Sequence, residues 1–223
     1  MTSALGILGG TFDPVHCGHV ELARELRAAL ALSAVRFIPA GDPPHRAAPV
    51  APAAHRLAMV ELAVAGQPGL EVDAREIHRA GRSYTVLTLE ELRSEFPTRA
   101  LALILGADAF LGLPSWHRWH ELFDLAHVVV VARPGVAIDP AMPPDLAREW
   151  TRRLRHDDAA LSTGVAGAIV LQPITAHAIS ASAIRANLAR GSDGVAAVRG
   201  LLPAAVLAYI DRNQLYRSRP DAT

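Results

Sequence analysis

The chain alternates between two patterns of hydrophobic and polar residues. Short apolar runs rich in β-branched side chains are typical of strands buried on both faces. Longer stretches with an apolar residue at every third or fourth position are typical of amphipathic helices. The first pattern predicts strands at Ala4–Leu8, Val35–Pro39, Leu70–Val72, Leu101–Leu105, Val128–Val131 and Ala168–Leu171. The second predicts helices at Val20–Leu30, His55–Ala65, Tyr84–Glu95, around Asp108–Leu122 and at about Leu146–Leu154.

Alternating strands and helices predict an α/β protein with a Rossmann-like, doubly wound parallel sheet and helices on both faces. Helical patterns at Ser182–Arg190 and Pro203–Asp211 follow the last predicted strand and predict a small C-terminal helical extension. We expect a single domain over 1–223, with a core at 1–178 and a C-terminal helical part at 179–217. The proline-rich segment 41–52 is expected to be an extended surface loop.

Composition narrows the classes of partner. The chain is 51% hydrophobic and 20% charged, as expected for a globular protein. Its 22 basic and 22 acidic residues balance, so no bulk field attracts nucleic acid or an anionic membrane. The single cysteine, Cys17, forms no intrachain disulfide and fits a reducing compartment. We therefore expect a cytoplasmic protein without a nucleic-acid or membrane partner.

The segment between the first predicted strand and the first predicted helix carries the strongest chemical signal. Its sequence, Gly9 to His19, contains three glycines, a threonine and two histidines. Glycines let the backbone approach a phosphate, and a helix N-terminus attracts anions. His16 and His19 add N–H donors that can carry positive charge. Two other interpretations are a plain glycine-rich turn capped by Asp13, and a metal site with Asp13 as third ligand.

A second segment, Ile179 to Arg185, opens the C-terminal helical part. Ser180 and Ser182 are N-cap residue types, and the first turn of a helix has unpaired N–H groups. Arg185 follows closely and carries a forked donor suited to phosphate.

The two segments resemble motifs of the nucleotidyltransferase superfamily. Gly9–His19 resembles the GTFDPxHxGH signature, and Ile179–Arg185 resembles ISxTxIR, with Ser182 in place of threonine. Further segments resemble the bacterial nicotinate-nucleotide adenylyltransferase family: Pro43–Arg46, Glu76–Arg79, Ser83–Leu89, Gly106–Asp108, Trp116, Val131–Gly135, and Leu202–Pro203 with Val206, Tyr209–Ile210, Leu215 and Tyr216.

The resemblance implies transfer of the adenylyl group of ATP to nicotinate mononucleotide, giving nicotinate adenine dinucleotide and pyrophosphate. It implies catalytic roles on the phosphates for His16, His19 and Arg185. We expect Mg²⁺ to arrive with ATP and no dedicated protein metal site. The residues predicted to bind ATP are Gly9, Gly10, Thr11, Phe12, Gly106, Asp108, Ile179, Ser180 and Ser182.

The resemblance also implies a site for the mononucleotide. It places the pyridine ring on Trp116, and the nicotinate carboxylate against Thr85 and the backbone of His117. Basic residues at the positions of Arg46 and Arg133 lie near substrate phosphates in the family. The residues predicted to bind the mononucleotide are Arg46, Tyr84, Thr85, Trp116, His117 and Arg133.

Three other functions remain open at this level. The acceptor could be nicotinamide mononucleotide or phosphopantetheine. The same pocket could serve a nucleotide sensor without catalysis. A histidine-based metallohydrolase would hold a stoichiometric metal and need no acceptor.

Overall fold

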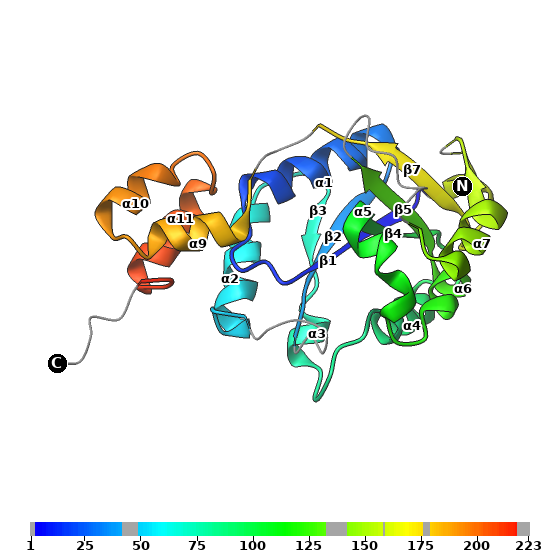
Figure 1. The fold of residues 1–223 in the computed structure, drawn as a ribbon, viewed down its shortest axis with the longest axis horizontal. Helices are drawn as coiled ribbons and strands as arrows, with labels where there is room; N and C mark the ends of the chain where they lie inside the picture. The colour runs from blue at the N-terminus through cyan, green and yellow to red at the C-terminus, as the bar shows by residue number, and fades with distance from the viewer. Residues whose placement is uncertain (1–2, 42–48, 133–141, 158, 176–178, 218–223) are drawn as a thin grey trace.

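The computed structural model describes residues 3–41, 49–132, 142–157, 159–175 and 179–217. Within them, seven strands form one sheet in the order β3-β2-β1-β4-β5-β7-β6, and every neighbouring pair is parallel. This arrangement confirms the predicted Rossmann-like fold (Figure 1). The strands are β1 (Leu5–Gly10), β2 (Ala34–Pro39), β3 (Leu70–Val72), β4 (Leu101–Gly106), β5 (His127–Ala132), β6 (Leu154–Arg155) and β7 (Ile169–Pro173).

Helices cover both faces of this sheet, as a doubly wound fold requires. The longer helices are α1 (Cys17–Ala29), α2 (Ala53–Val64), α4 (Thr85–Glu95), α7 (Pro144–Arg153), α9 (Ala181–Leu188) and α11 (Ala204–Arg212). The shorter ones are α3 (Arg75–His78), α5 (Ala107–Leu111), η1 (Leu113–Ser115), η2 (Trp119–Glu121), α6 (Leu122–Leu125), α8 (Ala160–Thr163) and α10 (Ser192–Ala197). None of the described helices is long and apolar enough to cross a membrane.

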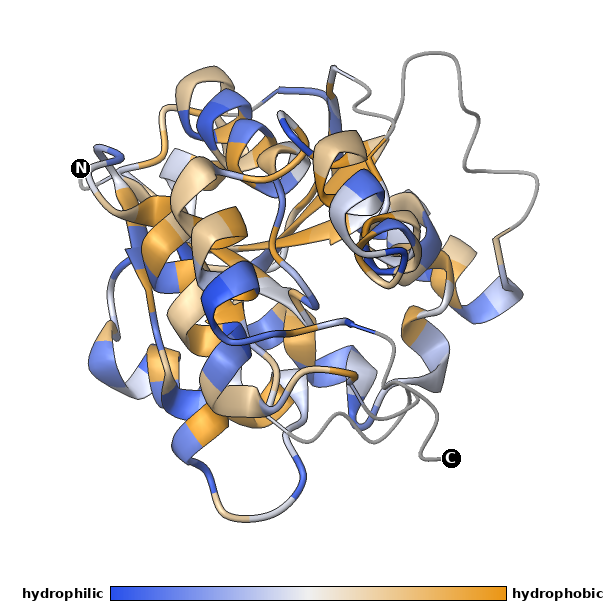
Figure 2. Cartoon of the chain, turned by 90° about the vertical axis from the view of Figure 1, so that its left-hand side faces the viewer, coloured by the Kyte–Doolittle hydropathy of each residue, from blue (hydrophilic) through white to orange (hydrophobic). Residues whose placement is uncertain are grey.

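Two hydrophobic cores lie on opposite faces of the sheet. Both cores contain alternate residues of β1, β2, β4 and β5. These residues pack on one face against α1, α2 and the C-terminal helices, and on the other face against α4, α5, α6 and α7. Figure 2 shows the strands mostly in the hydrophobic colour, with hydrophilic segments on the surrounding helices. Strand order reverses between β1 and β4, which is where sheets of this type bind ligands.

The first strand is longer than the sequence pattern predicts. β1 continues through Gly9 and Gly10, which pair with Ile38 and Pro39 of β2. The two glycines therefore end a strand, and the turn proper begins at Thr11. β4 ends at Gly106 in the neighbouring position, so both predicted loops lie at the carboxyl edge of the sheet.

The single helix expected around Asp108–Leu122 is wrong. That region forms α5, η1, η2 and α6 as four short pieces. Pro114 stands in the first turn of η1, where it cannot continue α5, and Arg118 has a left-handed φ of 54°. The break brings Trp116 and His117 out of any helix and toward the carboxyl edge.

The expected C-terminal extension is helical, with α10 as an additional short helix that the sequence pattern missed. Figure 1 shows α9, α10 and α11 grouped at one end of the molecule beside α2. Their buried residues, including Ile184, Val206 and Ile210, belong to the same core as α1 and α2. The division into a core at 1–178 and a helical part at 179–217 stays a prediction.

Candidate active site

The segment that joins β1 to α1 places His16 and His19 side by side. His16 is the N-cap residue of α1, and His19 lies in the first helical turn. Their rings stack with centroids 3.7 Å apart. The backbone N–H of His16 donates to Nδ1 of His19 over 3.2 Å. Because a neutral imidazole has one acceptor nitrogen and one N–H, this bond leaves Nε2 of His19 as the donor.

Burial keeps both imidazoles neutral at pH 7. It lowers the pKa of His16 to about 4, and together with the neighbouring His16 it lowers the pKa of His19 to about 3. Nδ1 of His16 is buried without a hydrogen-bond partner in the described part of the chain. A buried polar atom left unpaired is costly, so this nitrogen favours a polar ligand. The pair offers neutral N–H donors, and a positive charge here would require a bound anion.

Phe12 orients His19 from the side of the core. Its ring is buried and meets the ring of His19 edge-on, with centroids 5.1 Å apart. The backbone of Phe12 is left-handed, with φ of 49°. A Cβ added at Gly10 would lie 2.9 Å from the Phe12 ring, so glycine is required there. The sequence predicted that Phe12 binds ATP, and the structure shows that its side chain packs against a candidate catalytic residue.

Asp13 joins three segments that are distant in sequence. Its Oδ2 accepts the backbone N–H of Val50 over 2.8 Å, and its Oδ1 accepts that of Ala51 over 3.1 Å. The hydroxyl of Tyr216 donates to Oδ1 over 2.7 Å. The carboxylate therefore caps the Val50–Ala51 backbone, and the expectation that it caps its own turn is wrong. No group of three His, Cys, Asp or Glu side chains among the described residues could hold a metal ion.

Arg56 of α2 also connects these segments, because its guanidinium donates hydrogen bonds to three backbone carbonyls. Its guanidinium is buried and donates to the carbonyls of Thr11, Gly41 and Ala51, at 2.8, 3.2 and 3.2 Å. Burial lowers its pKa, and the nearby Asp13 partly offsets this effect. Sequence reasoning missed Arg56. The available signal was its position in the helical pattern, where it shares the apolar stripe with residues such as Met59 and Val60.

The start of α9 brings Arg185 to the histidine segment. Ser180 is the N-cap, and its Oγ accepts the N–H of Ala183 over 3.5 Å. Ser182 lies in the first turn, so its predicted capping role is wrong, and its Oγ instead accepts a bond from Nη2 of Arg185 over 3.4 Å. Nη1 of Arg185 donates to the main-chain oxygen of Asp13 over 2.7 Å. Ile179 precedes the cap and packs on the core.

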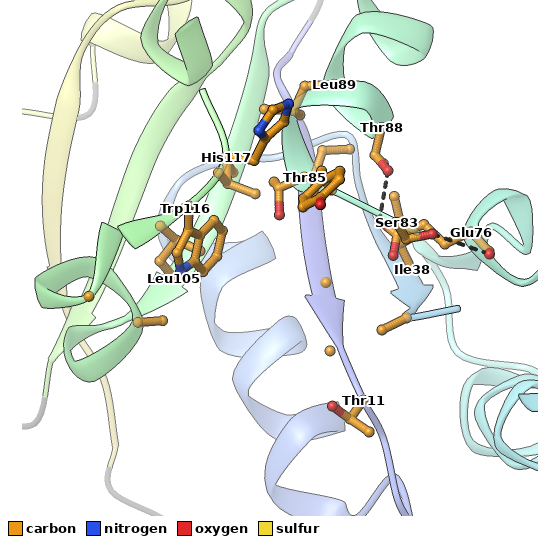
Figure 3. A pocket seen from close by; sticks show the side chains of 18 of the residues that line it. Thr11, Ile38, Glu76, Ser83, Thr85, Thr88, Leu89, Leu105, Trp116 and His117 are labelled. Carbon is orange, nitrogen blue, oxygen red and sulfur yellow. Dashed lines mark hydrogen bonds between the residues drawn. The ribbon is translucent and has the colours of Figure 1, made fainter. Parts of the chain in front are cut away.

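A cavity of about 400 Å³ opens beside this segment at the carboxyl edge of the sheet. Gly9, Gly10 and Thr11 form one wall. Figure 3 shows side chains from α4 and from the segment after α5 reaching into the same space. Residues of the predicted mononucleotide site that line it are Tyr84, Thr85, Trp116 and His117. The rings of Tyr84 and His117 pack together with centroids 4.5 Å apart.

The N-terminus of α4 faces this cavity. Tyr84 is its N-cap residue and makes no side-chain cap, so the first turn retains N–H groups for a carboxylate. Thr88 donates to Oε1 of Glu76 over 2.7 Å at the cavity wall, and burial raises the pKa of Glu76 (Figure 3). The sequence assigned no role to Glu76 or Thr88, because their contact depends on how α3 packs against α4.

The remaining predicted site residues are placed as follows. Gly106 ends β4 and is exposed, and Asp108 lines the cavity from α5. Gly106 is the N-cap of α5, and Asp108 lies in the first turn of this helix. Arg46 and Arg133 lie outside the described residues. His16, His19 and Arg185 stand beside the cavity wall and do not line the cavity itself.

Comparisons with known proteins agree with this geometry. A family model described as cytidylyltransferase-like matches residues 7–187. A protein of Dechloromonas aromatica named "Probable nicotinate-nucleotide adenylyltransferase" is 48% identical over 98% of this chain and 100% of its own length. A protein of Halorhodospira halophila with the same name is 52% identical over 91% of this chain and 90% of its own.

A solved structure shares the fold at much lower identity. Plasmodium falciparum nicotinic acid mononucleotide adenylyltransferase, complexed with NaAD, superposes with a TM-score of 0.71 at 15% identity. The match covers 96% of this chain and 97% of that one. This likeness supports the sheet and helix arrangement described above.

Proposed function

This chain belongs to the cytidylyltransferase-like family and, within it, to the nicotinate-nucleotide adenylyltransferases, and on that premise we propose its reaction. It transfers the adenylyl group of ATP to nicotinate mononucleotide. The products are nicotinate adenine dinucleotide and pyrophosphate. The proposal also places the reaction in the cytoplasm, where ATP is available and where the unpaired Cys17 is expected.

One observation carries the proposal: the Gly9–Thr11 backbone is shared by two neighbouring subsites. On one side stand the His16–His19 pair and Arg185, which suit phosphates. On the other side lies the aromatic cavity with the N-terminus of α4, which suits a ring bearing a carboxylate. A phosphate donor and a pyridine nucleotide can therefore meet at the edge of β1.

In the proposed mechanism, the 5′-phosphate of the mononucleotide attacks the α-phosphorus of ATP in line, and pyrophosphate leaves. The nucleophile is already an anion, so no general base is required. The protein positions the two phosphates and stabilises their charge. His16 and His19 donate to the α- and β-phosphates, and Arg185 binds the β- and γ-phosphates with the help of the α9 N-terminus.

Mg²⁺ enters this proposal bound to ATP. Magnesium commonly takes phosphate oxygens and water as ligands, and the described residues offer no cluster of three protein ligands for it. Chelation of Mg²⁺ is expected to abolish turnover, and added Mg²⁺ is expected to restore it.

The acceptor is set by the carboxylate subsite in this proposal. The first-turn N–H groups at Thr85 favour an anion, and a site built for an ion rejects an uncharged isostere. The test is pyrophosphate release from ATP and Mg²⁺, with nicotinate mononucleotide or nicotinamide mononucleotide in parallel. We expect kcat/KM for the acid to exceed that for the amide by at least about tenfold, the equivalent of one charge-assisted hydrogen bond.

Three outcomes would contradict parts of this proposal. Equal rates with both mononucleotides would remove the carboxylate subsite. Release with neither, together with release when phosphopantetheine is supplied, would change the acceptor. Tight ATP binding without pyrophosphate release for any acceptor would favour a sensor.

A further inference from the structure

The last described part of the chain returns to the segment that we assign to ATP. Tyr216 follows α11, is buried, and donates its hydroxyl hydrogen to Oδ1 of Asp13 over 2.7 Å. These two residues are 203 positions apart in the sequence. Tyr216 has a left-handed backbone with φ of 62°, a conformation rare for a residue with a side chain. The chain therefore adopts an unfavourable local geometry where it makes this one polar contact.

Both oxygens of the Asp13 carboxylate accept hydrogen bonds. Oδ1 accepts from Tyr216 and from the backbone of Ala51, and Oδ2 accepts from the backbone of Val50. The carboxylate is only 6% exposed, so these bonds replace those that water would make. Its orientation is thus set by three donors from two other segments of the chain.

Arg185 approaches this carboxylate without forming a close ion pair. Its Nη1 donates to the main-chain oxygen of Asp13 over 2.7 Å, yet lies 3.9 Å from Oδ2. The Arg185 side chain remains 29% exposed. A guanidinium held by a carbonyl keeps its charge available, whereas a bidentate pair with a carboxylate would occupy two of its donors.

We propose that Tyr216 is a positioning residue for adenylyl transfer, which keeps Asp13 turned away from Arg185 so that the guanidinium stays free for the phosphates of ATP. The hydroxyl of Tyr216 occupies Oδ1 and, with the two backbone donors, prevents the carboxylate from rotating into a bidentate pair with Arg185. This inference rests on the proposed function for the identity of the anion. The family resemblance includes Tyr216 among its residues, but it assigns this tyrosine no role.

The chain contains a matched control for this hydrogen bond. Tyr209 lies on α11 in the same C-terminal part, and its hydroxyl is 2.9 Å from Nδ1 of His55 on α2. Tyr209→Phe removes a hydroxyl group from the same C-terminal part of the chain, but the bond that it breaks goes to His55 on α2 and leaves Asp13 untouched. The two variants are therefore matched in chemistry and differ in their connection to Arg185.

The test compares Tyr216→Phe and Tyr209→Phe in the full chain, each also in an Arg185→Ala background. Binding of Mg²⁺-ATP is measured by calorimetry without acceptor, and kcat/KM for ATP is measured by formation of labelled dinucleotide.

We expect Tyr216→Phe to weaken ATP binding by about tenfold, in line with loss of one hydrogen bond to a charged group. We expect Tyr209→Phe to change it by less than about twofold, and KM for the mononucleotide to change little in either variant. In the Arg185→Ala background, Tyr216→Phe should have no further effect on kcat/KM for ATP.

Two results would overturn the inference. The first is an equal effect of both tyrosine variants on ATP binding, which would make Tyr216 a general anchor. The second is an undiminished effect of Tyr216→Phe when Arg185 is absent, because the tyrosine would then not act through that residue. If the unmodified protein binds ATP but makes no dinucleotide, the proposed reaction fails, while the binding comparison still decides the role of Tyr216.

Discussion

At the scale of single residues, the environment of the histidines decides what they can do. The sequence identifies His16 and His19 as a pair of candidate phosphate donors. The structure shows that their rings stack and that burial holds both neutral. The backbone of His16 also selects the tautomer in which Nε2 of His19 carries the hydrogen. The His19 side chain is therefore a preorganised hydrogen-bond donor that donates only through Nε2.

His19→Ala tests this role. Removal of one preorganised donor to a transition state typically lowers kcat by about a hundredfold or more, and we expect this loss in steady-state assays with both substrates saturating. His19→Gln retains an N–H and should fall between Ala and the unmodified protein. His120→Ala is the control, because His120 is exposed and packs on Trp119 away from the cavity. Near-normal kcat for His19→Ala would remove His19 from the catalytic group.

At the scale of elements, β5 and its neighbours depend on another histidine. His127 begins β5, is 1% exposed and has no place in the proposed reaction. Its Nδ1 accepts the N–H of Ala168 over 3.2 Å, so its Nε2 donates to the carbonyl of Gly164 over 3.0 Å. Burial lowers the pKa of His127, and the cationic Arg93 lowers it further. The neutral imidazole therefore connects β5 to the segment that leads into β7.

This arrangement predicts acid sensitivity. The folded pKa of His127 lies below its unfolded value of about 6.5, so its contribution to stability is full above pH 6.5 and declines as the pH falls. We expect the free energy of unfolding in urea to decrease from pH 7 to pH 5. His127→Gln keeps one donor and one acceptor but cannot be protonated. In this variant, the slope of the unfolding free energy against pH should correspond to uptake of about one proton fewer on unfolding. The same pH slope in both proteins would show that His127 does not titrate in this range.

At the scale of the whole molecule, the two proposed subsites belong to opposite faces of the sheet. Elements on the α1 face supply His16, His19 and Arg185, and elements on the α4 face supply Thr85 and Trp116. The two groups meet only at the carboxyl edge, where β1 and β4 are neighbours. A change on one face should therefore affect one substrate more than the other.

Trp116→Ala tests this separation. Loss of ring stacking and of apolar burial should raise KM for nicotinate mononucleotide by at least about fivefold. KM for ATP should change by less than about twofold, because Gly106 and Asp108 are the only residues of that face that we assign to ATP. Trp116→Phe keeps an aromatic ring and should recover most of the affinity. If KM rises equally for both substrates, Trp116 does not belong to a separate ring subsite.

Sequence patterns predicted the alternating elements, the parallel sheet and the two motif segments, and each of these is present in the structure. These predictions succeeded because strands that are buried on both faces have continuous apolar sequences. In addition, a phosphate site needs glycines and the start of a helix at a fixed spacing. The family also followed from these local features. The roles of the individual site residues stay predictions until variants are measured.

Other features depend on contacts between segments that are distant in sequence. The donors on Asp13 come from Val50, Ala51 and Tyr216, and no local pattern pairs these positions. The neutral state of His16 and His19 reflects burial, which exists only in the folded chain. Residue spacing along the chain therefore determined the fold class and the chemistry that is predicted for the site. Three-dimensional packing decided the protonation state of the histidines, the residues that support the site and the hydrogen bonds of Arg185, because these are set by solvent exclusion and long-range hydrogen bonds.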